Sequence, residues 1–338
     1  MEITTQSYDS RRYRLFFFKL SDYLTNFCQN TFKLTLHGGE PLLSSKAMLE
    51  RIFRLAHTVS KSSGVEIPIS LQTNAILLDQ EWLELFYHYN VKIGVSIDGP
   101  RSIHDRYRLD FKGNGTHEIV EDKLRWLLES EYGKEVFQGC LCVLDIVHDG
   151  AELVDYFYKL GIPKLDILLP DHNYDDPPAG SFSRIIIDAY EKWREIDDPD
   201  FDIRYFRQLI QPLLGGEITL DSLGEGPVSI FVVETSGEIE GLDVFKICGD
   251  SFTKTGLNIL DTSISDVSNI RLVKLGLDDK LSTPEVCRKC RNFSFCGGGY
   301  MPHRFRSGSF NNPTVYCEDM MQIVDHIRCD VHAELGIN

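Results

Sequence analysis

The sequence lacks the features that would place the protein in a membrane, outside the cell or on a nucleic acid. No stretch approaches the roughly 20 apolar residues that span a bilayer, so no membrane partner is expected. The start of the chain has no basic segment followed by an apolar run, as a signal peptide would. Lys and Arg number 35 against 51 Asp and Glu, and the net charge of −16 argues against a nucleic-acid partner. We therefore expect a cytoplasmic protein.

Cysteine is unevenly distributed, which excludes a regular secreted disulfide framework. Four of the nine cysteines stand near the C-terminus, as Cys287-x2-Cys290-x5-Cys296 followed by Cys317. Thiolates spaced in this way on a Gly-rich, polar segment can converge on one soft metal centre. The spacing alone allows structural zinc as readily as an iron–sulfur cluster.

Residues 31–170 alternate strand-like and helix-like segments, a pattern typical of a parallel sheet with helical crossovers. We expect strands at Phe32–Leu36, Ile67–Leu71, Val91–Ile97, Val136–Leu144 and Lys164–Leu169. We expect helices around Ser45–Ser62, Asp79–Tyr89, His117–Tyr132 and Ala151–Leu160. No Gly-x-Gly-x-x-Gly fingerprint is present. About five βα units therefore predict an α/β fold with a partial (β/α) barrel rather than a dinucleotide-binding sheet.

The character of the chain changes after Pro227. Two further helices, near Phe182–Glu195 and Ile203–Leu214, precede this point, and a hairpin over Val228–Asp243 follows it. We place a domain boundary at 215–227. The prediction is a barrel domain with its following helices over residues 1–214, and a small, loop-rich, Cys-rich metal-binding domain over residues 228–338.

Polar residues collect where the predicted parallel strands end, which is where such folds place their function. Gly38 and Gly39 let the backbone approach a ligand closely, and the Glu40 carboxylate suits an ammonium group. The following strands end in Asn74 and in Ser96 and Asp98, side chains able to bond hydroxyls such as those of a ribose. Their coincidence at successive strand ends predicts a binding site.

Three runs at these strand ends resemble successive motifs of radical S-adenosylmethionine (SAM) enzymes. They are Leu-His-Gly-Gly-Glu-Pro-Leu-Leu, Leu-Gln-Thr-Asn-Ala and Val-Ser-Ile-Asp-Gly-Pro-x3-His-Asp-Arg-Tyr-Arg. The Cys-rich region resembles the SPASM domain, the C-terminal extension of peptide and protein maturases. Its run Cys-Gly-Gly-Gly-Tyr-Met-Pro-His-Arg-Phe is similar to ribosomal-peptide maturases that form cyclophanes. The resemblance covers about residues 31–325.

Carried over by motif, the resemblance implies a SAM site in the barrel. It assigns Gly38, Gly39 and Glu40 to the methionyl amino group of SAM. It places Asn74, Ser96 and Asp98 along the ribose and carboxylate. Arg108 is the expected cation for that carboxylate, with Arg106 as its rival.

The resemblance also favours an auxiliary [4Fe-4S] cluster over zinc. It adds Cys248, at the end of the SPASM-like hairpin, to the four C-terminal cysteines. Five candidates then compete for the four places of one cluster, and which four ligate stays open. They are Cys248, Cys287, Cys290, Cys296 and Cys317.

The implied activity is hydrogen abstraction from a precursor peptide or protein, followed by cross-link formation. The implied electron donor is a flavodoxin or ferredoxin. No side chain stands out as the general base.

The family's radical-generating cluster is held by Cys-x3-Cys-x2-Cys, and this sequence has no such motif. Cys28 is the only cysteine before residue 140. We expect the first strand and cluster loop upstream of Met1, residues 7–28 as the first crossover helix, and no SAM cleavage by residues 1–338. SAM binding should then be weakened or lost. Truncation is favoured over decay of the motif; the alternative function is a non-catalytic, metal-stabilised peptide-binding homologue.

Overall fold

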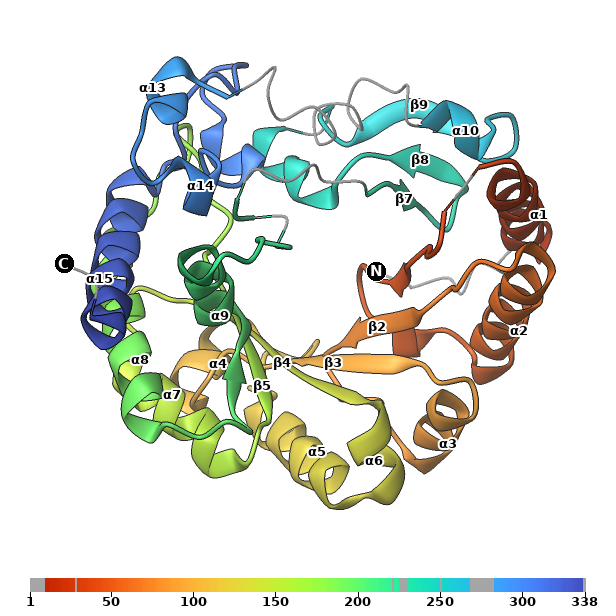
Figure 1. The fold of residues 1–338 in the computed structure, drawn as a ribbon. Helices are drawn as coiled ribbons and strands as arrows, with labels where there is room; N and C mark the ends of the chain where they lie inside the picture. The colour runs from red at the N-terminus through yellow and green to blue at the C-terminus, as the bar shows by residue number, and fades with distance from the viewer. Residues whose placement is uncertain are drawn as a thin grey trace. The chain divides into compact units, whose positions relative to one another are not determined.

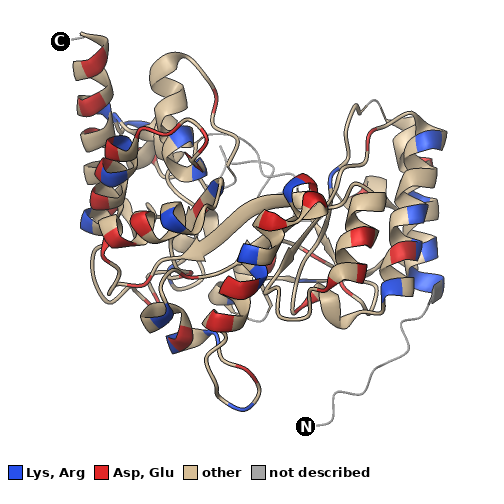
Figure 2. Cartoon of the chain, turned by 90° about the horizontal axis from the view of Figure 1, so that it is seen from below, with Lys and Arg blue, Asp and Glu red and all other residues tan. Residues whose placement is uncertain are grey.

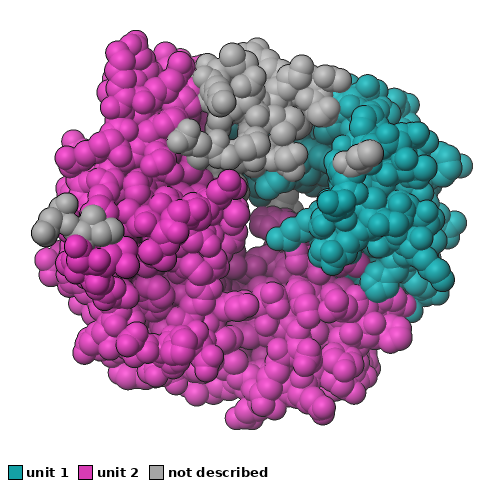
Figure 3. All heavy atoms as spheres, in the orientation of Figure 1, with its two compact units in different colours: residues 1–34, 47–68, 227–282 teal, residues 35–46, 69–226, 283–338 magenta. Residues whose placement is uncertain are grey.

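The computed structural model describes residues 10–27, 29–220, 222–224, 230–249, 251–267 and 283–336. The chain forms two compact units, each built from separate stretches (Figure 3). The first unit comprises residues 1–34, 47–68 and 227–282, and the second comprises 35–46, 69–226 and 283–338. Both units draw on the two sides of the boundary expected at 215–227, and the division into residues 1–214 and 228–338 stays a prediction.

A six-stranded sheet in the order β1-β2-β3-β4-β5-β6 forms the centre of the α/β fold (Figure 1). Its strands are β1 (Leu34–Leu36), β2 (Ile69–Thr73), β3 (Lys92–Ser96), β4 (Phe137–Val143), β5 (Lys164–Leu168) and β6 (Asp202–Ile203). Neighbours from β2 to β6 pair in parallel. The predicted partial (β/α) barrel is confirmed, and the short β6 is an additional strand that the sequence pattern did not reveal.

Helices connect or follow these strands, and most lie near the predicted positions, whereas the helix over residues 101–107 was not predicted. They are α2 (Lys46–Ser63), α3 (Gln80–His88), α4 (Arg101–Tyr107), α5 (His117–Glu129), α6 (Glu131–Val136), α7 (Gly150–Leu160), α8 (Ser183–Ile196) and α9 (Arg204–Ile210). Short polar side chains fix where several begin: Asp79 accepts from Trp82 N at 2.8 Å and Asp149 from Glu152 N at 2.9 Å. Helix α7 ends at Gly161, whose φ of 80° provides the left-handed cap.

Burial alternates along the central strands, so the two faces of the sheet differ. In β2 and β3 the buried residues are Ile69, Leu71, Thr73, Ile93 and Val95. These residues alternate along the strands and so share one face of the sheet. Helices such as α3 and α5 flank the sheet (Figure 1). The alternate residues of the same strands, among them Gln72 and Ser96, are only half-buried. The other face of the sheet is thus the polar one.

Charged residues are concentrated on the helices. Strands β2 and β4 contain none, whereas Lys, Arg, Asp and Glu are interspersed along the helices (Figure 2). Among the residues that the structure describes, no helix is long and apolar enough to cross a membrane.

The Cys-rich segment of the second unit is built from short helices. These are α13 (Glu285–Arg288), α14 (Phe293–Cys296) and the 3-10 helix η4 (Met301–Arg304), followed by the long α15 (Cys317–Leu335). Asp319 in α15 is buried, and its Oδ1 accepts from the N–H groups of Phe182 and Ser183, both at 2.8 Å. These two N–H groups open α8, so a carboxylate from the C-terminal helix caps it.

The first unit contains α1 (Ser10–Asn26), most of α2 and a three-stranded sheet, β7 (Val232–Val233), β8 (Glu238–Glu240) and β9 (Lys254–Asn258). The predicted hairpin is confirmed by the antiparallel pairing of Val233 with Ile239, whereas β9 was not predicted. Lys19 in α1 donates to the carbonyls of Ile259 at 2.7 Å and Thr262 at 3.0 Å. A helix is confirmed within residues 7–28, although Cys28 lies outside the described residues.

Removing the Asp319 carboxylate should destabilise the fold. Asp319→Ala removes the acceptor of Phe182 N and leaves Ser183 N only its 3.3 Å bond to Ser181 Oγ, so the free energy of unfolding should fall by about 2–3 kcal/mol. Urea denaturation measures this. Glu318→Ala, at the exposed neighbouring position, is the matched control and should change stability by less than about 0.5 kcal/mol. Equal effects of the two substitutions would contradict the capping role.

Candidate functional site

The loop after β1 offers open backbone at the polar edge of the sheet. Gly38 and Gly39 have φ of 86° and 38°, conformations that favour glycine. A Cβ built on either residue would meet no atom of the protein within 4 Å. The glycines are therefore not needed for packing against the chain itself, and the space beside them is available to a ligand.

Glu40 joins the end of β1 to the end of β2. Its Oε1 accepts from Leu42 N at 3.0 Å and from Thr73 Oγ1 at 2.7 Å, and its Oε2 accepts from Asn74 N at 2.8 Å. Asn74 in turn accepts from Ile76 N at 3.0 Å through Oδ1. These bonds fix the predicted residues Glu40 and Asn74 side by side. An ammonium contact by Glu40 stays a prediction.

Ser96 is fixed from the neighbouring strand. Gln72 Nε2 donates to Ser96 Oγ at 2.9 Å on the polar face of the sheet. Gly94 makes room for this arrangement, because a Cβ there would lie 2.2 Å from Gln72 Oε1. The sequence pointed to Ser96 but gave no sign of its partner Gln72.

Asp98 and Arg108 form a two-pronged ion pair. Arg108 Nη2 donates to Asp98 Oδ1 at 3.0 Å, and Arg108 Nε donates to Oδ2. Asp98, only 7% exposed, also accepts from Val143 N at 3.0 Å through Oδ1. The two residues predicted to contact SAM separately are thus bound to each other. Contact of either with a ligand stays a prediction.

Arg106, the rival of Arg108, pairs with a different carboxylate. Its Nη1 donates to Asp145 Oδ1 at 3.0 Å, just beyond the end of β4. Burial opposes ionisation of Asp145, but bonds from Val147 N and the Tyr107 hydroxyl hold its pKa below the ordinary value. Of the two arginines, Arg108 has the more buried side chain and Arg106 the more exposed one.

His104 is fully buried next to this pair. Its Nδ1 accepts from Asp98 N at 3.2 Å, and its Nε2 lies 3.1 Å from Thr116 Oγ1. The charged or titratable groups around it are Asp98, Arg108, His117 and Asp105. Desolvation lowers the pKa of His104 to about 4, so the ring is neutral at physiological pH. The sequence placed His104 within a motif but assigned it no role.

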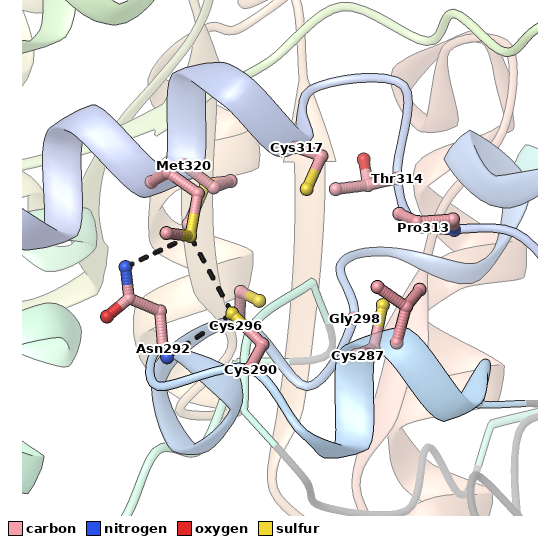
Figure 4. Close-up of a pocket in the computed structure, with 11 residues that line it drawn as sticks. Cys287, Cys290, Asn292, Cys296, Gly298, Pro313, Thr314, Cys317 and Met320 are labelled. Atoms are coloured by element: carbon pink, nitrogen blue, oxygen red, sulfur yellow. Dashed lines mark hydrogen bonds between the residues drawn. The ribbon is translucent and has the colours of Figure 1, made fainter.

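The four C-terminal cysteines line one cavity of about 90 Å³ in the second unit (Figure 4). Cys287 lies in α13, Cys290 between α13 and α14, Cys296 at the end of α14 and Cys317 at the start of α15. The other lining residues are mainly apolar or small, including Met320 and Met321. The four cysteines therefore share one cavity, and their convergence on a metal centre stays a prediction.

The cavity disfavours four negative charges without a cation. Burial raises the pKa of the Cys296 thiol to about 11; the Gly298 N–H opposes this rise, and the other three sulfurs add to it. Burial also raises the pKa of Cys287 and Cys317, although the Arg304 guanidinium counteracts the rise at Cys287. Arg304 is 2% exposed and donates to the carbonyls of Gly297 and Gly299, both at 2.8 Å.

The cysteines are not arranged around a single ion. Across the described part of the chain, no group of three or more His, Cys, Asp or Glu side chains is placed to hold one metal ion. Cys248 is buried at the end of the 3-10 helix η3 (Asp243–Cys248) in the first unit. Its membership of the metal site stays a prediction.

Comparison with known proteins identifies the family. Residues 25–157 match the model of the radical SAM superfamily. A protein of Methanothermobacter thermautotrophicus described as uncharacterized is 35% identical over 194 residues, which cover 54% of this chain and 71% of that protein. The chain belongs to the radical SAM superfamily. It is an enzyme by this membership, and the family works with an iron–sulfur cluster and SAM.

Other relatives of this radical SAM protein are maturases. The cysteine-type anaerobic sulfatase-maturating enzyme of Clostridium perfringens strain 13 is 26% identical over 273 residues, covering 78% of this chain and 72% of the relative. The solved structure of native anSMEcpe with bound AdoMet and Cp18Cys peptide has a TM-score of 0.82 and 21% identity. It covers 96% of this chain and 91% of that chain, and it shows that the fold is shared.

The buried neutral His104 should make stability depend on pH. Between pH 6.5 and about 4 the unfolded chain binds a proton at this ring that the folded chain does not. The free energy of unfolding should therefore fall as pH drops through this window, by on the order of 3 kcal/mol from His104. Urea denaturation from pH 7 to 4 measures it. His104→Asn, which cannot titrate, should lose correspondingly less, and parallel curves would contradict the assignment.

Proposed function

We propose that this chain binds S-adenosylmethionine at the polar edge of its sheet and acts as a radical SAM maturase on a peptide or protein substrate. The observation that carries the proposal is the set of strand-end groups around Gly38 and Gly39. Open backbone, an adjacent carboxylate and a buried Asp98–Arg108 pair occupy successive strand ends in a chain of this superfamily.

The residues fit the chemistry of SAM. Its amino group is a cation that Glu40 can accept beside the N–H groups it already binds, since a carboxylate has about four lone-pair sites. Its carboxylate is an anion suited to the Arg108 guanidinium, whose Nη1 has no bond to Asp98 in the pair described above. Ser96 and Asn74 supply polar groups for the ribose. Under this proposal, the ion pair with Asp98 holds the Arg108 guanidinium in position to bind the carboxylate of SAM.

The four-cysteine cavity fits an iron–sulfur cluster better than zinc. A single zinc would draw four sulfurs to about 2.3 Å from one point. A [4Fe-4S] cluster instead takes each thiolate on a different iron, so it suits four cysteines that line one cavity without being grouped around a single ion. The cluster would be held by Cys287, Cys290, Cys296 and Cys317, with Cys248 as the competing fifth candidate. When bound, it supplies one-electron chemistry.

The maturase relatives support a peptide or protein substrate. Sulfatase-maturating enzymes and a structure with bound peptide are among the proteins similar to this chain. We extend this to a precursor peptide or protein as substrate, with cross-link formation as the outcome and a flavodoxin or ferredoxin as electron donor. Because no Cys-x3-Cys-x2-Cys is present, we propose that residues 1–338 alone bind SAM with weakened affinity and form no 5′-deoxyadenosine.

A methyl group at Gly38 should weaken SAM binding. Gly38→Ala meets no protein atom but places a Cβ where the ligand would approach, so SAM affinity should fall about tenfold. Gly64→Ala is the matched control, because Gly64 also has positive φ (74°) and open surroundings but lies at the end of α2. Both variants carry a similar backbone strain of about 1–2 kcal/mol. Equilibrium binding of SAM measures the difference; equal affinities, or no binding by the unsubstituted chain, would contradict the proposed site.

Single alanine substitutions should separate cluster ligands from bystanders. After anaerobic reconstitution, replacing Cys287, Cys290, Cys296 or Cys317 should remove most of the iron, sulfide and visible absorption. Cys329→Ala, on the exposed part of the same helix as Cys317, is the control and should leave about four irons per chain. Cys248→Ala decides the place of the fifth candidate. One zinc and no iron in the unsubstituted protein would overturn the cluster.

A further inference from the structure

The backbone N–H and C=O of Asp98 are each bonded to a buried histidine. His104, from α4, is 0% exposed, and its Nδ1 accepts from Asp98 N at 3.2 Å. His148, from the loop between β4 and α7, is 5% exposed, and its Nε2 lies 3.0 Å from Asp98 O. Two histidines from different elements thus bind the donor and the acceptor of a single residue.

The contacts of each ring define its tautomer. His104 Nδ1 accepts a backbone N–H, so the neutral ring carries its proton on Nε2 and donates to Thr116 Oγ1 at 3.1 Å. The Thr116 hydroxyl then donates to Arg108 O at 2.9 Å. His104 therefore connects Asp98 to the backbone of its own ion-pair partner.

His148 is arranged in the same way. Its Nδ1 accepts from Asp145 N at 2.8 Å, with the Asp145 carbonyl further away at 3.2 Å. The proton therefore lies on Nε2, which donates to Asp98 O. The ring links the ends of β3 and β4 at the point where Val143 N also binds the Asp98 carboxylate.

Gly99 allows the second histidine to approach. It has φ of 90°, and a Cβ on it would lie 3.2 Å from His148 Nε2 and 2.7 Å from Leu153 Cδ1. The Asp98-Gly99 sequence thus serves the histidine contact rather than a simple turn. No comparable space is left for a ligand at Gly99.

We propose that His104 and His148 are positioning residues that clamp the backbone N–H and C=O of Asp98, so that its carboxylate is held toward Arg108 before any ligand binds. The use of this clamp in SAM binding rests on the proposed function. The clamp itself rests only on the geometry of the second unit. A rigid carboxylate–guanidinium pair costs less ordering when the ligand binds.

Matched amide substitutions test each clamp bond. An Asn side chain can place its oxygen near the Nδ1 position of His, and a Gln side chain can place its nitrogen near the Nε2 position. His104→Asn and His148→Gln should therefore keep the bond to Asp98, whereas His104→Gln and His148→Asn should lose it. The retaining variants control for burial and for loss of the imidazole ring.

Two measurements on residues 1–338 separate the clamp from the proposed function. Hydrogen–deuterium exchange of peptides that contain Asp98 should be about tenfold faster in the two losing variants and within about twofold of the unsubstituted protein in the two retaining variants. Equilibrium binding of SAM should weaken about tenfold in the losing variants only, equal to the loss of one hydrogen bond.

The outcomes are distinct. Equal exchange in retaining and losing variants overturns the clamp, whatever the SAM result. The positioning role is overturned if exchange is faster only in the losing variants but these variants bind SAM as tightly as the unsubstituted chain does. The same exchange pattern without any SAM binding supports the clamp and contradicts the proposed function instead.

Discussion

The central constraint in the second unit is that the buried carboxylate of Asp98 needs hydrogen-bond and charge partners. A carboxylate that is 7% exposed loses most of its hydration, so protein groups must replace the hydrogen bonds that water would make. Arg108 provides the opposite charge and Val143 N provides a further donor. These partners come from beyond α4 and from β4, while Asp98 itself follows β3. One ionised side chain therefore determines how three consecutive segments meet at the polar edge of the sheet.

The sequence was sufficient for most of the sheet and its helices but not for the contacts between side chains. The strands β2–β5 and the helices between them form from strong apolar periodicity, so they were predictable. Strand β6 has only two residues, and β9 contains no buried residue, so neither has an apolar pattern that could be recognised in the sequence. Asp98 and Arg108 were each assigned to a ligand because motif positions give no information about pairs. Their ion pair depends on how α4 turns back toward β3, which is set by tertiary packing.

The cysteine cavity illustrates the same limit in another way. Spacing predicted that Cys287, Cys290, Cys296 and Cys317 would meet, because only short segments separate three of them and α15 supplies the fourth. Spacing did not predict the medium around them. Burial raises the pKa of three of the four thiols, while the buried Arg304 acts in the opposite direction at Cys287. A positively charged metal core would offset the cost of ionising these thiols, so under the proposed function binding of the metal is coupled to the loss of their protons.

The glycines of the polar edge show how a ligand-facing position differs from a packing position. At Gly94 the space that a Cβ would take is occupied by the side chain of Gln72. At Gly99 it is occupied by the side chains of Leu153 and His148. At Gly38 and Gly39 no atom of the chain takes that place. Open space with positive φ is not sufficient by itself, because Gly64 and Gly113 share it in ordinary loops. Gly38 and Gly39 differ from these glycines because they directly precede Glu40, whose carboxylate connects two strand ends. They also lie at the edge where parallel sheets bind ligands. The proposed site therefore depends on the combination of these features, and neither the glycine motif nor the open space supports it alone.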